Sequence, residues 1–300
     1  MPTIAKVLGI DEVVKYAKYF TIKYLNAVPH TGSMEDCIFP TGTEVFDTLL
    51  NGYEGSVLTA IYGPSGTGKT TVCLLAAIAT IKAGKKVIFV DTEGGFSTMR
   101  FQQLLQEDHK TPYLEKIFLM KPMTFADQAK TVARLRELVN EQIGLVIVDS
   151  VSMLYRIELG KHEGVKGINS DLGLQLFYLS TIARKWNIPV LITSQVYADF
   201  EEKDKVKMVG GDIIKYGAKC LIEVEKYRTL RKATIMKHRS LPEQKAVVFE
   251  IISNGFQLFE QPVQETEAAK SVQKKSVSEE IAVRFPELKG KEFEDAANVN

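Results

Sequence analysis

The sequence has few of the residues that mark a secreted, metal-binding or membrane protein. Its three cysteines, Cys37, Cys73 and Cys220, lie far apart and form no Cys-x-x-Cys pair, so we expect reduced thiols and neither a disulfide framework nor a zinc site. His162 and Glu163 lack the second histidine of a metalloprotease helix. No apolar run reaches the roughly 18 residues that span a membrane, and the first residues lack the layout of a signal peptide. We therefore expect a soluble, cytoplasmic protein.

The chain also lacks an excess of charge of either sign. It has 38 Lys and Arg against 37 Asp and Glu, which gives a net charge of +1. Bulk charge therefore indicates no partner, and any contact with nucleic acid must come from local clusters of basic residues. With 300 residues and 45% hydrophobic content, the chain is long enough to bury a substantial core in one or two domains.

What the sequence does contain is a complete phosphate-binding loop, GPSGTGKTT, at residues 63–71. The apolar SVLTAIY before it predicts a buried strand, and TTVCLLAAIATIKAG after it predicts a helix ending at Ala83 with Gly84 as C-cap. In such a loop, backbone N–H groups surround the β-phosphate, the lysine reaches the β- and γ-phosphates, and the threonine hydroxyl binds Mg²⁺. The alternative is a chance glycine-rich turn. The predicted ATP-binding residues are Gly63, Pro64, Ser65, Gly66, Thr67, Gly68, Lys69, Thr70 and Thr71.

The middle of the chain, residues 38–259, has the pattern of one α/β domain. KKVIFVDT, LVIVDS and IPVLITSQ are apolar runs typical of buried parallel strands, and segments of helical spacing separate them. This alternation predicts a largely parallel, twisted sheet flanked by helices. After Gly217, AKCLIEVEKY, RKATIMKHR and AVVFEIISNGFQLF predict antiparallel strands at one edge, the last two joined by an Asn254-Gly255 turn.

The two ends of the chain differ from the middle. We expect an N-terminal extension over residues 1–36, a core over 37–260, and a polar linker and tail over 261–300. The extension has apolar residues at helical spacing between Val13 and Val28, and its TGSM segment resembles a cloning junction. It is therefore either a native helical segment or a non-native addition.

Two carboxylates are candidates for the chemistry of hydrolysis. Asp149 closes the LVIVDS strand, where it is well placed to hold the water shell of a metal ion. Glu93, just beyond VIFVDT, is the candidate that positions and deprotonates the attacking water. Acids beyond the ends of parallel strands lie in the crevice where open α/β sheets bind ligands. The alternatives are a helix N-cap for Asp149 and a solvated loop acid for Glu93.

Four segments occur in the order and spacing of the RecA-type recombinase core: GPSGTGKTT, VIFVDTEGGFSTMRF, LVIVDSVS and VLITSQV. Over residues 39–259 the chain resembles that family, and within it the archaeal RadB and RadA proteins. The resemblance implies a RecA-like P-loop ATPase fold that uses ATP and Mg²⁺, with Thr70 and Asp149 at the metal. It also implies that Glu93 activates water beside Lys69, and that Gln195 senses the γ-phosphate and relays its presence to the DNA loops.

Arg100, in FSTMRF, matches an arginine that lies against the adenine in this family. A planar guanidinium can stack on a base, and the alternative is a surface arginine. The chain departs from RadA-type enzymes in two features. Neither a helix-hairpin-helix domain nor a Phe-x-x-Ala docking motif is readable, because Phe20 and Phe39 are not followed by Ala at the third position. The segment that matches the second DNA loop, VYADFEEKDKVKMVGGD, is short and mixed in charge.

The most basic segment, EKYRTLRKATIMKHRS, is the expected binding site for single-stranded DNA, with Tyr227 available for stacking on a base. Its Lys-His-Arg run resembles a basic element of RadB. About five phosphate contacts would give a log–log salt slope near −3.5. The alternative is a solvated edge strand whose lysines discourage aggregation. The predicted DNA-binding residues are Lys226, Arg228, Arg231, Lys232, Lys237, His238 and Arg239.

These observations leave three functions open. The first is a RadB-like DNA repair protein that binds ATP and single-stranded DNA, hydrolyses ATP weakly, and acts as a mediator for a RadA-type recombinase, alone or as a homo-oligomer. The second is an active strand-exchange recombinase. The third is a KaiC-like regulatory ATPase that signals through protein contacts.

Overall fold

The computed structural model describes residues 37–106, 111–161, 165–198 and 206–259. The chain divides after Phe259 into two units, and all of the described residues belong to the first. The predicted N-terminal helix, the polar linker and the tail lie outside them. Among the described residues, no helix is both long and apolar enough to cross a membrane.

Five parallel strands form the centre of the main sheet, in the order β3-β7-β6-β4-β5. Every residue of β3, β6 and β7 is buried, because helices cover both faces of the sheet. These strands therefore read in the sequence as continuous apolar runs. Their bounds are β3 Leu58–Tyr62, β4 Lys86–Asp91, β5 Ile117–Met120, β6 Ile143–Asp149 and β7 Val190–Ser194.

The predicted antiparallel strands extend this sheet beyond β3. Strand β10 (Cys220–Tyr227) pairs parallel with β3, and β11 (Leu230–Lys237), β12 (Ala246–Ile252) and β13 (Gly255–Leu258) follow as antiparallel neighbours. The turn at Asn254 joins the last two. The sequence-based prediction of this edge is confirmed.

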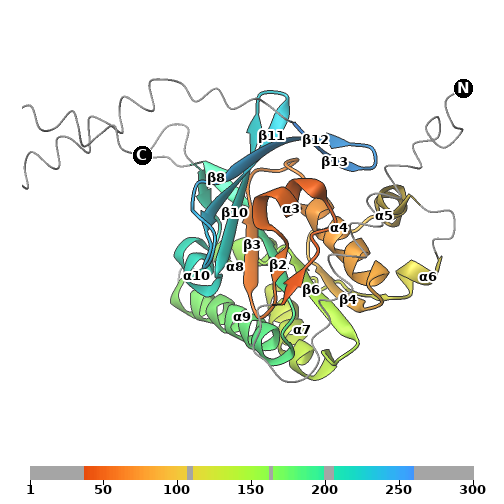
Figure 1. Cartoon of the computed structure of the whole chain (residues 1–300). Helices are drawn as coiled ribbons and strands as arrows, with labels where there is room; N and C mark the ends of the chain where they lie inside the picture. Colours follow the sequence, from red (N-terminus) through yellow and green to blue (C-terminus); the bar gives the residue numbers. More distant parts are fainter. Residues whose placement is uncertain (1–36, 107–110, 162–164, 199–205, 260–300) are drawn as a thin grey trace, which may run out of the picture. The chain divides into compact units, whose positions relative to one another are not determined.

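Helices pack on the two faces of the sheet in separate layers (Figure 1). Successive residues of β4 point to opposite faces, so Val87 and Phe89 belong to one core cluster while Ile88 and Val90 belong to the other. The first layer contains α3 (Glu44–Leu50), α4 (Lys69–Lys82) and α5 (Thr98–Leu105), and the second contains α7 (Phe125–Leu138), α8 (Met153–Leu159), α9 (Val165–Trp186) and α10 (Gly211–Gly217).

Short elements complete the described residues. Strands β1 (Ile38–Phe39) and β2 (Tyr53–Glu54) form one antiparallel pair, and β8 (Val196–Ala198) and β9 (Val206–Met208) form another. Helix α6 spans Thr111–Leu114. The β8–β9 ribbon follows directly from β7, so it stands at the carboxyl end of the parallel strands.

An aromatic cluster holds the antiparallel edge of the sheet against the first helix layer. The rings of Phe249 in β12 and Phe256 in β13 lie 4.9 Å apart, and each lies 6.1 Å from Phe46 in α3. Phe46 and Phe249 are fully buried. The cluster fixes the β12–β13 hairpin beside the start of α4.

Candidate nucleotide-binding site

The phosphate-binding loop, residues 63–68, connects β3 to α4 at the carboxyl end of the parallel strands. Gly63 and Gly68 have positive φ angles of 154° and 96°. A Cβ atom on Gly63 would lie 1.9 Å from the Val224 carbonyl oxygen, and one on Gly68 would lie 3.2 Å from Ile251. These glycines are therefore required by the neighbouring strands β10 and β12, in addition to the approach of a phosphate.

The amine of Lys69 lies against this loop. Its Nζ atom donates to the carbonyl oxygens of Gly63 and Pro64, each at 2.8 Å. Burial lowers the pKa of the Lys69 amine below its usual range, and the nearby carboxylates Glu93 and Asp149 oppose this shift. The lysine is thus held in place, and phosphate oxygens would replace two neutral carbonyls with charged acceptors.

Asp149 is buried between two threonines at the end of β6. Thr70 Oγ1 donates to Asp149 Oδ2 at 2.6 Å, and Thr193 Oγ1 donates to Asp149 Oδ1. The residue is 2% exposed. Burial raises the pKa of Asp149 above its usual range, although the two threonine hydroxyls counteract the shift. The predicted metal residues Thr70 and Asp149 are therefore in direct contact.

This pair of oxygen donors suits a magnesium ion. A Cβ on Gly95 would lie 3.4 Å from Thr70 Oγ1 and 3.7 Å from Asp149 Oδ2, so the glycine keeps that side of the pair open. No group of three or more His, Cys, Asp or Glu in the described part of the chain could hold a metal by itself. An ion here would take its remaining ligands from phosphates and water, as Mg²⁺ usually does.

The loop that carries Glu93 is tied down at both of its ends. The backbone N–H groups of Gly95 and Phe96 donate to the buried Asp91 carboxylate at 2.9 and 3.1 Å. Thr92 Oγ1 donates to the Ser150 carbonyl oxygen at 2.7 Å and accepts from the Ser150 N–H at 2.9 Å. These bonds join the end of β4 to the end of β6, where Asp91 and Asp149 are also register partners.

One oxygen of Glu93 accepts two hydrogen bonds. Ser150 Oγ donates to Oε1 at 2.5 Å, and Gln195 Nε2 donates to the same atom at 3.0 Å. Ser150 is fully buried, and its Oγ also accepts from the Met153 N–H at the start of α8. Among the described residues the second oxygen, Oε2, accepts no hydrogen bond. The structure therefore brings together two of the predicted catalytic residues, Glu93 and Gln195, and adds Ser150.

Gln195 connects this carboxylate to the β8–β9 ribbon. Its backbone N–H donates to Ser152 Oγ at 2.9 Å, and its carbonyl accepts from the Val209 N–H at 2.9 Å. Ser194 Oγ donates to the Val209 carbonyl, also at 2.9 Å. Gln195, whose side chain donates to Glu93, thus lies at the start of the ribbon, so a rotation of Gln195 would be transmitted to the ribbon.

These groups surround one cavity of about 500 Å³. It is lined by Glu93, Asp149 and Gln195 together with most of residues 65–71. Gly63, Pro64 and Thr67 shape the loop without lining the cavity. Three further lining residues were not predicted from the sequence, namely Arg156, Val196 and Ile251. The cavity can hold a polyphosphate, an oxygen-ligated cation and a water molecule beside a carboxylate.

The guanidinium of Arg100 is already engaged. It donates to the Ser253 carbonyl at 2.5 Å, the Ile252 carbonyl at 3.2 Å and Gln103 Oε1 at 2.7 Å. These bonds tie α5 to the β12–β13 hairpin. Arg100 does not line the cavity, whereas Ile251, which precedes the Ile252 that it contacts, does. Contact with an adenine remains a prediction, and it would require at least a partial exchange of these bonds.

The seven predicted DNA-binding residues do not form one patch. Strand β11 separates them by about 24 Å, at roughly 3.4 Å per residue from Leu230 to Lys237. Lys226 and Arg228 are exposed near the β10–β11 turn, close to the phosphate-binding loop. Arg231 donates to the Gly66 carbonyl at 3.1 Å, and Lys232 pairs with Glu225 at 3.1 Å.

The remaining three lie at the other end of β11 and make local contacts. Lys237 Nζ donates to two carbonyls at the end of α10, those of Lys215 at 2.7 Å and Ala218 at 2.9 Å. His238 Nδ1 accepts from two backbone N–H groups, and Arg239 pairs with Glu54.

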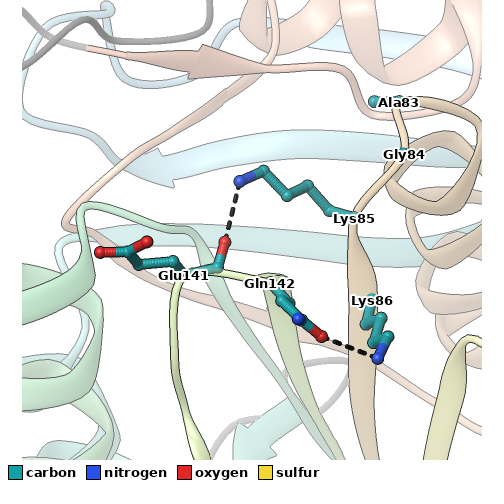
Figure 2. Close-up of a pocket in the computed structure, with 6 residues that line it drawn as sticks. All are labelled: Ala83, Gly84, Lys85, Lys86, Glu141 and Gln142. Atoms are coloured by element: carbon teal, nitrogen blue, oxygen red, sulfur yellow. Dashed lines mark hydrogen bonds between the residues drawn. The ribbon is translucent and has the colours of Figure 1, made fainter.

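A second hollow, of about 590 Å³, lies at the opposite end of the parallel strands (Figure 2). Lys85 Nζ donates to the Glu141 carbonyl and Lys86 Nζ donates to Gln142 Oε1, each at 2.8 Å. Both lysines tie the start of β4 to the loop before β6. Because both lysine amines are engaged in these structural hydrogen bonds, we place the functional site at the carboxyl end of the strands.

A phosphate-binding loop between a buried strand and a helix, with its lysine, threonine and acids around one cavity, defines a P-loop nucleotide-binding protein with a RecA-like core. The sequence matches the Rad51 family over residues 35–258, which is most of the chain. The chain belongs to the Rad51 family, in its RadB branch of DNA repair and recombination proteins. Proteins of this family generally use ATP and Mg²⁺.

Individual relatives agree with this assignment. The chain is 39% identical to the DNA repair and recombination protein RadB of Methanoculleus marisnigri, over 72% of this chain and 95% of that protein. It is 38% identical to RadB of Methanococcoides burtonii, over 70% and 92%. A crystal structure of the RadB recombinase is 34% identical, with a TM-score of 0.64, and covers 74% of this chain and all of that one. The predicted RecA-like fold is confirmed.

Proposed function

We propose that this protein binds ATP with Mg²⁺, hydrolyses it slowly, and binds single-stranded DNA as an accessory of a RadA-type recombinase. The observation that carries the proposal is the meeting of Lys69, Thr70, Asp149, Glu93 and Gln195 around one cavity. The relatives are named DNA repair and recombination proteins, which supports the DNA-related part.

In the proposed reaction, Glu93 Oε2 accepts a proton from a water molecule that attacks the γ-phosphorus, and ADP leaves on the opposite side. Lys69 exchanges the carbonyls of its own loop for oxygens of the β- and γ-phosphates. A Mg²⁺ ion at Thr70 would neutralise phosphate charge, with Asp149 orienting its water shell.

The contacts of Gln195 support a slow reaction that is coupled to DNA. Its amide is bonded to Glu93 at 3.0 Å, so Gln195 has to exchange that carboxylate for the γ-phosphate before it can act as a sensor. The same residue continues into β8. Nucleotide state is then passed to the ribbon by the rotation of one side chain.

The test is steady-state ATP hydrolysis with Mg²⁺, with and without single-stranded DNA, in the wild type and in Glu93→Gln. We expect slow turnover that Glu93→Gln lowers by at least about 100-fold, because the isosteric amide cannot accept the proton. ATP binding should survive the substitution. Turnover that is equal in both proteins would contradict the assignment of Glu93.

The same measurement, together with an oligonucleotide-binding assay, separates the two other functions. Strong stimulation by DNA, lost in Glu93→Gln, would support an active strand-exchange recombinase. Failure of the wild type to bind oligonucleotides even at low salt would support a regulatory ATPase that acts through protein contacts.

A further inference from the structure

Arg156 is a cationic residue of the cavity that no sequence motif indicated. It lies on α8, the helix that begins directly after the turn whose Ser150 donates to Glu93. The Met153 N–H donates to Ser150 Oγ at 3.2 Å, and the Arg156 N–H donates to the Ser152 carbonyl at 2.9 Å. The first turn of this helix is therefore anchored to Ser150 and Ser152, and its arginine lines the cavity.

The charges of the cavity come from separate elements of the fold. Its lining contains two cations, Lys69 and Arg156, and two carboxylates, Glu93 and Asp149. Lys69 belongs to the phosphate-binding loop, where the β-phosphate would lie. Arg156 comes from α8 and lines the cavity together with Glu93 and Gln195, the residues proposed to meet the attacking water and the γ-phosphate, so it is the cation that does not come from that loop.

The guanidinium of Arg156 is available. Within the described part of the chain it is exposed and makes no hydrogen bond or ion pair. The arginines at positions 100, 231 and 239 differ, since each donates to a carbonyl or a carboxylate. An arginine stays charged at any physiological pH and offers five N–H donors in a planar fork that matches phosphate oxygens.

We propose that Arg156 binds the γ-phosphate and is the residue by which the site distinguishes ATP from ADP. This inference rests on the proposed binding of ATP. Lys69 and the loop would contact both nucleotides, whereas Arg156 gains a partner only when a third phosphate is present. Arg156 is thus a specificity residue whose effect is confined to the triphosphate.

The test is isothermal titration calorimetry with Mg²⁺ and either ADP or β,γ-imido-ATP, an analogue that is not hydrolysed. The proteins are the wild type, Arg156→Ala, Arg156→Gln and Arg156→Lys. Arg184→Ala is the matched control, because Arg184 is an exposed arginine on α9 that donates to the Ser180 carbonyl. Arg156→Ala should weaken binding of the triphosphate by about 10- to 100-fold, the range for a charged hydrogen bond.

Binding of ADP by Arg156→Ala should stay within about twofold of the wild type, which also serves as the check that the variant is folded. Arg156→Gln should resemble the alanine variant, and Arg156→Lys should keep part of the preference. An equal loss for both nucleotides, or no loss, would overturn the inference and leave the proposed function standing. If the wild type binds neither nucleotide, both fail. If the variants lose oligonucleotide binding alone, Arg156 contacts DNA and the inference is wrong.

Discussion

At the scale of single residues, the site depends on how one carboxylate is oriented. Ser150 and Gln195 both donate to Oε1 of Glu93, and Glu93 lines the cavity. Ser150 does not line the cavity. It acts through Glu93, and we regard it as a positioning residue.

Replacement of Ser150 by alanine should therefore lower kcat about tenfold and leave KM for ATP nearly unchanged, because one hydrogen bond to a charged group is lost. The measurement is steady-state hydrolysis combined with a double-mutant cycle. Added to Glu93→Gln, Ser150→Ala should cause no further loss if it works only through Glu93. A further tenfold loss in the double variant would indicate a separate role for Ser150.

Sequence reasoning found Asp149 because it ends a buried strand and Glu93 because it lies just beyond one, where the strand ends of a parallel sheet converge. Gln195 came from the family resemblance. Ser150 and Arg156 were missed for a physical reason. Their positions depend on how the chain turns after β6 and on the direction of the short helix α8. Neither hydrophobic periodicity nor the spacing of motifs predicts these two features. Arg100 was singled out from a motif, but its bonds to the β12–β13 hairpin depend on strands that lie about 150 residues later.

At the scale of elements, long periodic segments were predicted well. The helix after the phosphate-binding loop ends at Lys82 with Ala83 as C-cap, and Gly84 follows with a φ of 87°. Strand β5 and helix α3 were not predicted. Both are short, and β5 is an edge strand whose middle residues are exposed, so it has no continuous apolar run.

The basic run at the end of β11, residues 237–239, makes structural contacts within the protein, although its composition suggested a DNA-binding site. Arg239 and Ser240 bind the buried Glu54 of β2, and Lys237 donates to the last carbonyls of α10, where a cation is favourable. His238 Nδ1 accepts from the N–H groups of Ser240 and Leu241, each at 3.1 Å. This role requires the unprotonated ring.

Stability should therefore depend on pH through His238. Burial lowers the pKa of His238 below its ordinary value of 6.5, with Arg239 adding to the shift and Glu54 opposing it. As pH falls below about 6.5, the unfolded chain takes up the proton first, so the stabilisation present at higher pH is lost. In urea unfolding, His238→Leu, which removes the acceptor, should be less stable than the wild type near pH 7.5, and the difference should shrink near pH 5.5. A difference that is constant with pH would contradict this.

At the scale of the whole described core, exposed positive charge is left near the β10–β11 turn. Lys226 and Arg228 are exposed there, and Arg228 lies over the Tyr227 ring at 5.8 Å from its centroid. Arg231 in the same hairpin contacts Gly66 of the phosphate-binding loop. If DNA binds at this end, it lies next to the nucleotide.

The double variant Lys226→Ala with Arg228→Ala should bind single-stranded DNA more weakly and with a shallower salt dependence. Loss of two phosphate contacts would reduce the log–log slope by about 1.4. The measurement is fluorescence anisotropy of a labelled oligothymidine between about 50 and 200 mM salt. Lys130→Ala with Arg134→Ala, two exposed cations of α7, is the charge-matched control. Equal loss in the control would mean that only net charge matters.

The register of β4 against β6 has a consequence beyond packing. Asp91 and Asp149 are partners in it, and the loop with Glu93 is bonded to the turn with Ser150. A slip of one residue would turn every side chain of β4 to the opposite face and separate these groups. The cavity therefore exists only in a chain whose central sheet has assembled in one alignment. Nucleotide binding then reports that a molecule is correctly folded, and a molecule with a shifted register should not bind nucleotide.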